Sequence, residues 1–600
     1  MKIDDLTRIK EMYSQLKSDR ENYKPTWEKI ARYTGIAVDP DYIRNKERDK
    51  GTDLDQYISD PTSMTAVNQF GDYIIGIMWG TGDRALNIVP SRYVLEYTDS
   101  DIVADYYDFV TSQLLYHMNH EDAGLNNALK PYAYDQASFG TSAVGAFPNQ
   151  AFKERKADNA LIFRPYGIDN LCIDEGKNGS VEYIFATYNW RVSRIVGEFC
   201  HDGSGGVDES KVCKLPKELM DCYQKGDLNK KHTIVFGVLP RADFDPKLQG
   251  KRGTKYRGVW FLENSKEGGI FAEEDFAEKP IAVARMIKVR GETFGRSSGT
   301  MLLSTISAVN FMLSTSIEIL EKMANPSLGV FGNAIFGDSV LDTSPQGLTV
   351  FNPALSGNGN PAFPLFDVGN PAPLMQMLIP YLNDKILSAF KIDALLDFNQ
   401  SADMTATESM QRYTIRAKSL AGILTQQKTE LLAPLVKRCV SVLMALEQLG
   451  VDPRVSGEKA AMLLQINKQE RIIPAEVSRV MAEGRPWFEI RFNNEMERMT
   501  RTEALQNLIQ VLNAIGGIAP LYPQIIEAVD WYKLLADINN NLDANNQIII
   551  SEQEFKDKIL AAAQMQQNMM AMQAGQMGAQ IQKDMAGANK SNSEAANGIR

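Results

Sequence analysis

The sequence predicts an α+β protein that is mainly helical. Amphipathic runs with a spacing of three to four residues dominate residues 1–130 and return between residues 297 and 450. Residues 140–290 between them hold short β-branched and aromatic runs separated by Gly, Asp and Asn. The long run 297–323 has no charged side chain between Arg296 and Glu318. Helical blocks around a β region are typical of α+β folds.

Composition narrows the class of protein. A chain of 600 residues with 44% hydrophobic and 23% charged residues is typical of a globular protein of two to four domains. The net charge of −11 argues against a general nucleic-acid coat, but it allows a protein that touches DNA without gripping it. We find no run of eighteen apolar residues and no signal peptide, so we expect no membrane contact and no export. Five cysteines, an odd number, argue against a disulfide framework.

The N-terminal helices are predicted first. Leu6, Ile9, Tyr13 and Leu16 share one face of a charged amphipathic helix. A second helix is expected from Pro25, because proline favours the first turn. Asp60-Pro-Thr-Ser63 provides a start for a helix through Trp79.

The β region follows from its apolar runs. Each run is bounded by turn-forming residues, which predicts a strand. The five runs are residues 160–168, 181–190, 232–240, 256–264 and 280–289.

The uncharged helix after the β region has two distinct faces. One apolar face is formed by Leu302, Ile306, Val309, Leu313, Ile317 and Leu320. A second face is formed by Ser304, Ser307, Phe311, Ser314 and Glu318. Small polar side chains allow close packing against neighbours, so the helix could lie in a ring of subunits around a water-filled lumen. An ordinary buried helix in a monomer stays open as the alternative.

The remaining elements are predicted in order. Residues 325–373 are rich in Gly, Pro and Asn, with short strand-like pieces, and a second helix spans 374–396. A polar loop 397–404 leads to a third helix over 405–450, which starts at the capping box Thr405–Glu408 and is expected to kink at Pro434. Residues 451–560 are mixed, with a strand at 487–492. The Met/Gln-rich residues 561–600 should begin as a helix and end disordered, and they could bind partners or pack against copies of themselves.

Residues 295–299, Gly-Arg-Ser-Ser-Gly, match the spacing of a hydrolase nucleophile elbow. That reading makes Ser297 a nucleophile, but all four histidines precede it, whereas the elbow needs its histidine downstream. We therefore disfavour a Ser hydrolase and expect the glycines to shape a loop into the helix. The same loop does not match a phosphate-binding P-loop.

Other candidate chemistry is weak. Cys200, His201, Cys213 and Cys222 lack the spacing of a zinc site, and core positions explain the cysteines better. His117 and His120 suit surface or capping roles, and the acidic loop 202–208 does not fit a calcium-binding register. We predict no catalytic residue, no metal and no cofactor.

Two stretches give the sequence a family resemblance. They are "ARMIKVRGETFGRSSGTMLLSTISAVNFM", residues 284–312, and "MTATESMQRYTIRAKSLAGILTQQKTELLAPLVKRCVSVL", residues 404–443. Together with "LKSDRENYKPTWEKIARYTGI", "AVNQFGDYIIGIMWG" and "YDQASFGTSAVGAF", they resemble the head-to-tail connecting (portal) proteins of podovirus-type bacteriophages. Phe294, Ser297-Ser298 and Val309 depart from the family's usual Tyr, Gly-Pro and Leu.

The resemblance implies the portal fold, in which wing, stem, clip and crown assemble into a ring with a central channel. Its parts would be the wing 1–296, stem helix 1 at 297–324, the clip 325–373, stem helix 2 at 374–396, the tunnel loop 397–404, a kinked wing helix 405–450, the wing remainder and crown 451–560, and a C-terminal helix or barrel with a disordered tail at 561–600.

The resemblance also implies the residues that face DNA. The tunnel loop would present Asn399, Gln400, Ser401 and Asp403. The stem candidates for lining the channel are Ser307, Ser314, Glu318, Glu321, Lys322, Asp384, Lys385 and Lys391. The three lysines could contact phosphate, although pairing with the acidic neighbours is the expectation we prefer. Twelve helices about 9–10 Å apart leave a bore of roughly 24 Å, wide enough for a duplex.

The function implied is that of a non-enzymatic ring. A homo-dodecamer at one capsid vertex would pass double-stranded DNA during packaging and ejection. Its partners would be the terminase large subunit, major capsid and scaffolding proteins, and tail adaptor or nozzle proteins, with no membrane. It would lie at the head-tail junction of the virion after assembly in the bacterial host cytoplasm. A monomeric scaffold protein without a channel is a further alternative.

Overall fold

The computed structural model describes most of the chain up to residue 492. The described residues are 3–34, 59–79, 85–95, 101–153, 156–200, 206–245, 248, 251–265, 269–331, 344, 347–351, 362–364, 372–391, 421–450, 472–492, 511–512, 534, 558, 561, 564–565, 572 and 576–587. The chain divides into two units, residues 1–494 and 495–600, and the features below belong to the first unless stated.

Helices dominate the N-terminal part, as predicted. They are α1 (Ile3–Glu21), α2 (Lys24–Thr34), α4 (Thr62–Met78), α5 (Arg92–Leu95), α6 (Asp101–Asn119) and α7 (Leu125–Phe139), with a short 3-10 helix η2 (Glu121–Ala123) before α7. Asp60 stabilises the start of α4. Its Oδ1 accepts two hydrogen bonds from Thr62, one from the backbone N at 3.3 Å and one from the side-chain hydroxyl at 2.8 Å.

A five-stranded antiparallel sheet forms the larger β layer. Its order is β4 (Leu171–Glu175), β5 (Val181–Arg191), β6 (Lys231–Pro240), β7 (Tyr256–Leu262) and β8 (Ala272–Phe276). Ile9 and Tyr13 of α1 pack on one face, against Phe185 and Phe261. The opposite face joins the larger core with Trp27 of α2 and with the short helices α9 (Val192–Phe199) and α11 (Lys217–Gln224). Helix α10 (Glu209–Val212) and the 3-10 helices η3 (Ile168–Asn170) and η4 (Lys251–Gly253) lie in the connections.

A second, three-stranded sheet has the order β3-β2-β9. Its strands are β2 (Thr141–Pro148), β3 (Leu161–Tyr166) and β9 (Ile281–Arg285), with α8 (Gln150–Lys153) between the first two. All five predicted runs are therefore strands, in β3, β5, β6, β7 and β9. The strands β2, β4 and β8 were not predicted.

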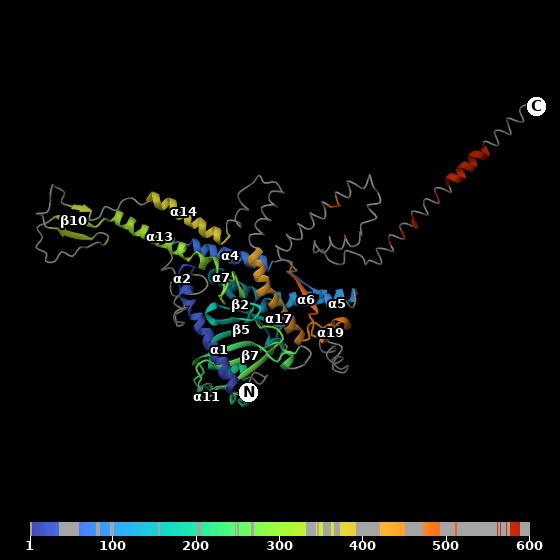
Figure 1. The fold of residues 1–600 in the computed structure, drawn as a ribbon, viewed down its shortest axis with the longest axis horizontal. Coiled ribbons are helices and arrows are strands. Elements are labelled where there is room, and N and C mark those ends of the chain that lie inside the picture. Colours follow the sequence, from blue (N-terminus) through green and yellow to red (C-terminus); the bar gives the residue numbers. More distant parts are fainter. Residues whose placement is uncertain are drawn as a thin grey trace, which may run out of the picture. The chain divides into compact units, whose positions relative to one another are not determined.

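The long uncharged helix exists and has a partner. After the short α12 (Ser298–Met301), α13 (Leu303–Ala324) runs alongside α14 (Ala372–Ala389), as Figure 1 shows. Beyond α13 lies a small sheet of β10 (Leu328–Phe331), β11 (Leu348–Phe351) and β12 (Ala362–Pro364). We call α12 to α14 the helical hairpin. Its second helix ends earlier than predicted, because the chain turns at Lys391, whose φ is 61°.

The third predicted helix is described from residue 421. It widens into a π turn at Lys428–Leu432 and continues as α17 (Ala433–Ala445). A kink was expected at Pro434, and the helix instead has a π turn that ends two residues before this proline. Helix α19 (Ala475–Ala482) leads to β13 (Phe488–Phe492), the predicted strand, which pairs with β1 (Leu86–Pro90).

In the second unit, the described residues 576–587 are helical. Met577, Ile581 and Met585 are exposed there at a four-residue spacing, which makes one apolar stripe. This agrees with the expected helical start of the Met/Gln-rich segment.

Candidate functional site

The base of the helical hairpin is a tightly packed loop between β9 and α12. Ile287 and Arg296 bridge its two sides with backbone hydrogen bonds of 3.2 and 2.9 Å. Gly295 donates its backbone N–H to the hydroxyl of Thr141 at 2.8 Å. Gly140, with φ of 84°, approaches so closely that a Cβ there would lie 2.3 Å from the carbonyl carbon of Arg296. The loop therefore depends on glycine where it contacts strand β2.

Ser297 caps the helix at this base. Its hydroxyl donates to the carbonyl of Ser138 at 2.6 Å and accepts from the backbone N of Thr300 at 3.0 Å. The residue is completely buried. The buried hydroxyl both donates and accepts a hydrogen bond, so capping of the helix accounts for Ser297.

Arg285 holds the base of the helical hairpin in place. It was not among the predicted site residues. Its side chain is completely buried, and it donates from Nη2 to the carbonyl of Gly179 at 2.9 Å. Glu430 of the π turn and Glu175 both form ion pairs with its guanidinium. The only hint in the sequence was an arginine inside an otherwise apolar strand run.

The buried face of α13 is shorter than predicted. Ile306 and Val309 are buried, and Leu302 and Leu313 are half-buried. Asn310 is buried as well, and its Oδ1 accepts from the backbone N of Ser59 at 2.9 Å and of Asp60 at 3.0 Å. The predicted apolar face is exposed farther along, at Ile317 and Leu320.

Large apolar side chains are exposed on the hairpin. Ser316 of α13 contacts Met375 of α14 through its hydroxyl and the thioether sulfur, at 2.7 Å. The exposed side chains outside such contacts are Met301, Phe311, Ile317, Leu320, Met323, Met377 and Tyr381, of which Phe311 is 71% and Met377 76% exposed. We call these seven residues the apolar hairpin surface.

The predicted stem residues lie on this hairpin. Ser307 and Ser314 of α13 are half-buried, whereas Glu318, Glu321 and Lys322 are exposed near its C-terminal end. On α14, Asp384 and Lys385 are exposed, and Lys391, in the turn after this helix, is half-buried. The four predicted tunnel-loop residues, Asn399, Gln400, Ser401 and Asp403, lie outside the described residues.

The pairing expected of the three stem lysines is not seen among the described residues. Lys322, Lys385 and Lys391 were expected to pair with acidic neighbours, but none forms an ion pair with a described residue. Lys385 instead places its Nζ 5.3 Å from the ring centre of Tyr381. Extended side chains on an exposed helix gain little from ion pairs, which explains the result.

Helix α13 is long and apolar enough, by length and composition alone, to cross a membrane. Its most apolar window has a mean hydropathy of 1.3, and 17% of that window is buried. Helices of soluble proteins also reach such values. Asn310 ties α13 to the start of α4, and α14 packs along it.

The described histidines and cysteines show no assembled site. His117 is buried, its Nδ1 accepts from the backbone N of Ala160 at 3.4 Å, and burial lowers its pKa. The Sγ of Cys222 lies 3.6 Å from Nε2 of His232, and Cys200 and Cys213 are free. Within the described part of the chain, no group of three His, Cys, Asp or Glu could hold a metal ion. His201 and residues 202–205 of the acidic loop lie outside it.

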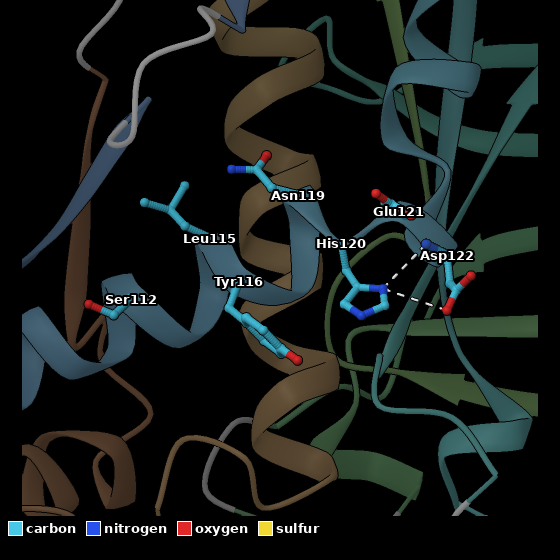
Figure 2. Close-up of a pocket in the computed structure, with 7 residues that line it drawn as sticks. All are labelled: Ser112, Leu115, Tyr116, Asn119, His120, Glu121 and Asp122. Carbon is cyan, nitrogen blue, oxygen red and sulfur yellow. Dashed lines mark hydrogen bonds and ion pairs between the residues drawn. The ribbon is translucent and has the colours of Figure 1, made fainter.

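A hollow of about 630 Å³ lies elsewhere, where α6 meets η2. Figure 2 shows its seven lining residues, Ser112, Leu115, Tyr116, Asn119, His120, Glu121 and Asp122. The Nδ1 of His120 accepts from the backbone N of Asp122 at 3.3 Å. None of the predicted channel residues lines this hollow. Among its seven lining residues, no nucleophilic side chain is hydrogen-bonded to a side chain that could act as its general base.

One protein family matches nearly the whole chain. The family described as "Bacteriophage head to tail connecting protein" matches residues 6–549. This range contains both large sheets, the helical hairpin and the π turn.

Individual relatives are more distant. The "Probable portal protein" of Bordetella phage BPP-1 is 20% identical over 558 residues, which cover 92% of this chain and 91% of that protein. A chain of the solved structure titled "Virion of native gene transfer agent (GTA) particle" is 11% identical, covering 71% of this chain and 91% of that one, with a TM-score of 0.27. We infer nothing about the fold from a TM-score of that size.

Proposed function

The chain belongs to the bacteriophage head to tail connecting protein family, and from this premise we propose that it is a portal protein. Twelve copies would form a ring at one capsid vertex. Double-stranded DNA would pass along the axis of the ring during packaging and ejection. The ring would lie at the head-tail junction of the virion, after assembly in the bacterial host cytoplasm.

The observation that carries this proposal is the apolar hairpin surface. In an isolated chain, side chains such as Phe311 and Met377 stay in water, at a cost of roughly 25 cal/mol for each Å² left uncovered. The surface lies on both helices, α13 and α14. If α13 of one copy packs on α14 of the next, each copy buries both parts. Such head-to-tail contacts generate a ring when the rotation between successive copies closes.

The proposed channel wall combines small, acidic and a few basic side chains. Ser307 and Ser314 allow close approach, and Glu318, Glu321 and Asp384 repel phosphate. Lys322, Lys385 and Lys391, which lack ion pairs with described residues, are the proposed sparse phosphate contacts. Each contact between a lysine and a DNA phosphate makes DNA binding salt-dependent and slows the release of DNA. A channel through which DNA must move should therefore have few such contacts. Asn399, Gln400, Ser401 and Asp403 would complete the wall as a tunnel loop.

The partners follow from the division of the chain. The clip, residues 325–373 with the β10 sheet, would dock the terminase large subunit during packaging and tail adaptor or nozzle proteins afterwards. The wing would meet the major capsid and scaffolding proteins. No step requires the chain itself to catalyse a reaction, because the terminase would supply the motor.

Native mass spectrometry of the purified full chain tests the proposal. The expected species has twelve times the chain mass of 66.9 kDa. A single species at the chain mass under all assembly conditions would instead favour the channel-less scaffold. Ser297→Ala separates the hydrolase alternative, since a portal keeps ring formation and DNA packaging, whereas a hydrolase loses its activity.

A further inference from the structure

Two arginines are enclosed in the core around the β3-β2-β9 sheet, and they differ in their partners. Arg285 is held by Glu430 and Glu175. Arg438 of α17 is 6% exposed, and its Nε donates to the carbonyl of Ala146 at 3.2 Å. Its guanidinium carbon lies 4.9 Å from the ring centre of Phe276. Figure 1 shows α17 beside β2, which carries Ala146.

The rest of the Arg438 guanidinium has no partner. Among the described residues, its two terminal nitrogens make no hydrogen bond and no ion pair. These two nitrogens are not completely enclosed, so they keep a small accessible surface. Arginine is almost never buried to this degree unless it is paired.

The nearby carboxylates Glu274 and Glu278 do not form an ion pair with Arg438. Glu274 and Glu278 favour the charged form of Arg438, but neither comes within the 4 Å of an ion pair in the described structure. Glu274 accepts a hydrogen bond from Nε1 of Trp260 at 2.9 Å. Burial lowers the pKa of Arg438 to about 10, so the group is still a cation at neutral pH. The described part of the chain therefore holds an enclosed positive charge without a counter-charge.

We propose that Arg438 is a receptor for a carboxylate side chain of a second copy of this chain, which enters when copies assemble. This inference rests on the proposed ring. It assigns an intersubunit contact to α17, away from the helical hairpin.

The shape of the free edge fits a carboxylate. The Nε of Arg438 donates to Ala146, and the Phe276 ring lies against the guanidinium, which leaves the edge with the two terminal nitrogens. Two parallel N–H groups match the two oxygens of a carboxylate. A second copy can supply one, because the chain carries 75 Asp and Glu against 64 Lys and Arg.

The experiment compares the full-length wild type with Arg438→Met and Arg438→Lys. Methionine has similar length and no charge, so the thermal midpoint of the unassembled Arg438→Met chain should rise. The protein concentration needed for half-assembly should increase by roughly 30-fold or more, because a buried charge pair across the interface is lost. Lysine keeps the charge but lacks the planar guanidinium with its parallel N–H groups. The half-assembly concentration of Arg438→Lys should therefore lie between those of the wild type and Arg438→Met.

Arg285→Met is the matched control, since it removes an arginine whose carboxylates are already in place. It should lower the thermal midpoint of the unassembled chain. A lower midpoint for Arg438→Met as well would mean that its carboxylate comes from the same chain, and would overturn the inference. Unchanged assembly of Arg438→Met would also overturn it.

The inference and the proposed ring can fail separately. If the wild type forms rings and Arg438→Met forms them equally well, only the role of Arg438 is wrong. If the wild type forms no rings at any concentration, the proposed function and this inference both fall.

Discussion

Arg285 and Glu430 form an ion pair that joins strand β9 to the π turn of the third helix. The carboxylate Oε2 of Glu430 accepts from the backbone N of Arg285 at 2.8 Å and from its Nε at 3.2 Å. Burial lowers the pKa of the guanidinium, but the hydrogen bonds that it donates to Glu430 and Glu175 outweigh burial and raise the pKa. The pair ties the base of the helical hairpin to a helix 145 residues away.

Removal of one charge from this pair should be costly. Glu430→Gln leaves Arg285 buried with a weaker partner, which should reduce the free energy of unfolding by about 3–5 kcal/mol. Urea unfolding followed by circular dichroism measures this difference. Glu292→Gln is the control, because Glu292 pairs with the half-exposed Arg296. It should cost at most about 1 kcal/mol. Equal effects of both substitutions would contradict the structural role of Arg285.

Gly140 should not tolerate a side chain. A Cβ there would lie 2.3 Å from the carbonyl carbon of Arg296 and 2.5 Å from the backbone N of Ser297. Gly140→Ala should therefore destabilise the chain by about 1–3 kcal/mol or more, since backbone atoms must move. Gly197→Ala, in helix α9 with no atom near its Cβ, should instead stabilise by about 0.5–1 kcal/mol. A thermal midpoint of Gly140→Ala at or above that of the wild type would show that the close contact is wrong.

The apolar hairpin surface should matter for assembly rather than for folding. Phe311→Ser should leave the unfolding of the unassembled chain within about 0.5 kcal/mol of the wild type, because Phe311 is exposed. It should reduce ring formation, as measured by sedimentation velocity. Ile306→Ser, at a completely buried position on the same helix, should reduce stability by about 3 kcal/mol. If Phe311→Ser assembles as the wild type does, the hairpin surface is not the contact between copies.

The small side chains of α13 should resist enlargement. Ser307 and Ser314 are half-buried, and Arg at either position adds bulk and an unpaired charge. Ser307→Arg and Ser314→Arg should reduce ring assembly or DNA packaging, which negative-stain imaging and packaged-DNA assays measure. Normal rings that fill with DNA in both variants would rule out this placement of the polar face.

Asp135 of α7 should make stability depend on pH. Burial, followed by the nearby Asp169, raises the pKa of Asp135 well above its ordinary value of about 3.9. The folded chain therefore binds a proton that the unfolded chain releases, and this contribution is present below about pH 4 and lost as the pH rises toward the folded pKa.

Asp135→Asn should accordingly be more stable than the wild type at pH 8, by about 1.4 kcal/mol for each unit of the shift. The difference should shrink as the pH falls to 4. Urea midpoints across this range measure it, with the exposed Asp122→Asn as the control. A constant difference at every pH would mean that Asp135 does not titrate as inferred.

Much of the fold could be predicted because local patterns determine it. The runs that became β5, β6 and β7 are β-branched and aromatic, and the long helix has a clear repeat. Strand β2 was missed because it consists largely of small residues with Gly145 inside, and β8 because its charged residues 273–275 are exposed at a sheet edge. The site was harder to predict. Arg285 and Glu430 are far apart in the sequence, and an arginine such as Arg438 in a helix normally indicates a surface position.

The most direct test is projection imaging of the purified full-length protein, alone, over a range of concentrations. The expected result is a population of twelve-fold rings, each with an open centre wide enough for a DNA duplex. Solid, solitary particles of one chain at every concentration would contradict the proposal that the helical hairpins line a shared channel.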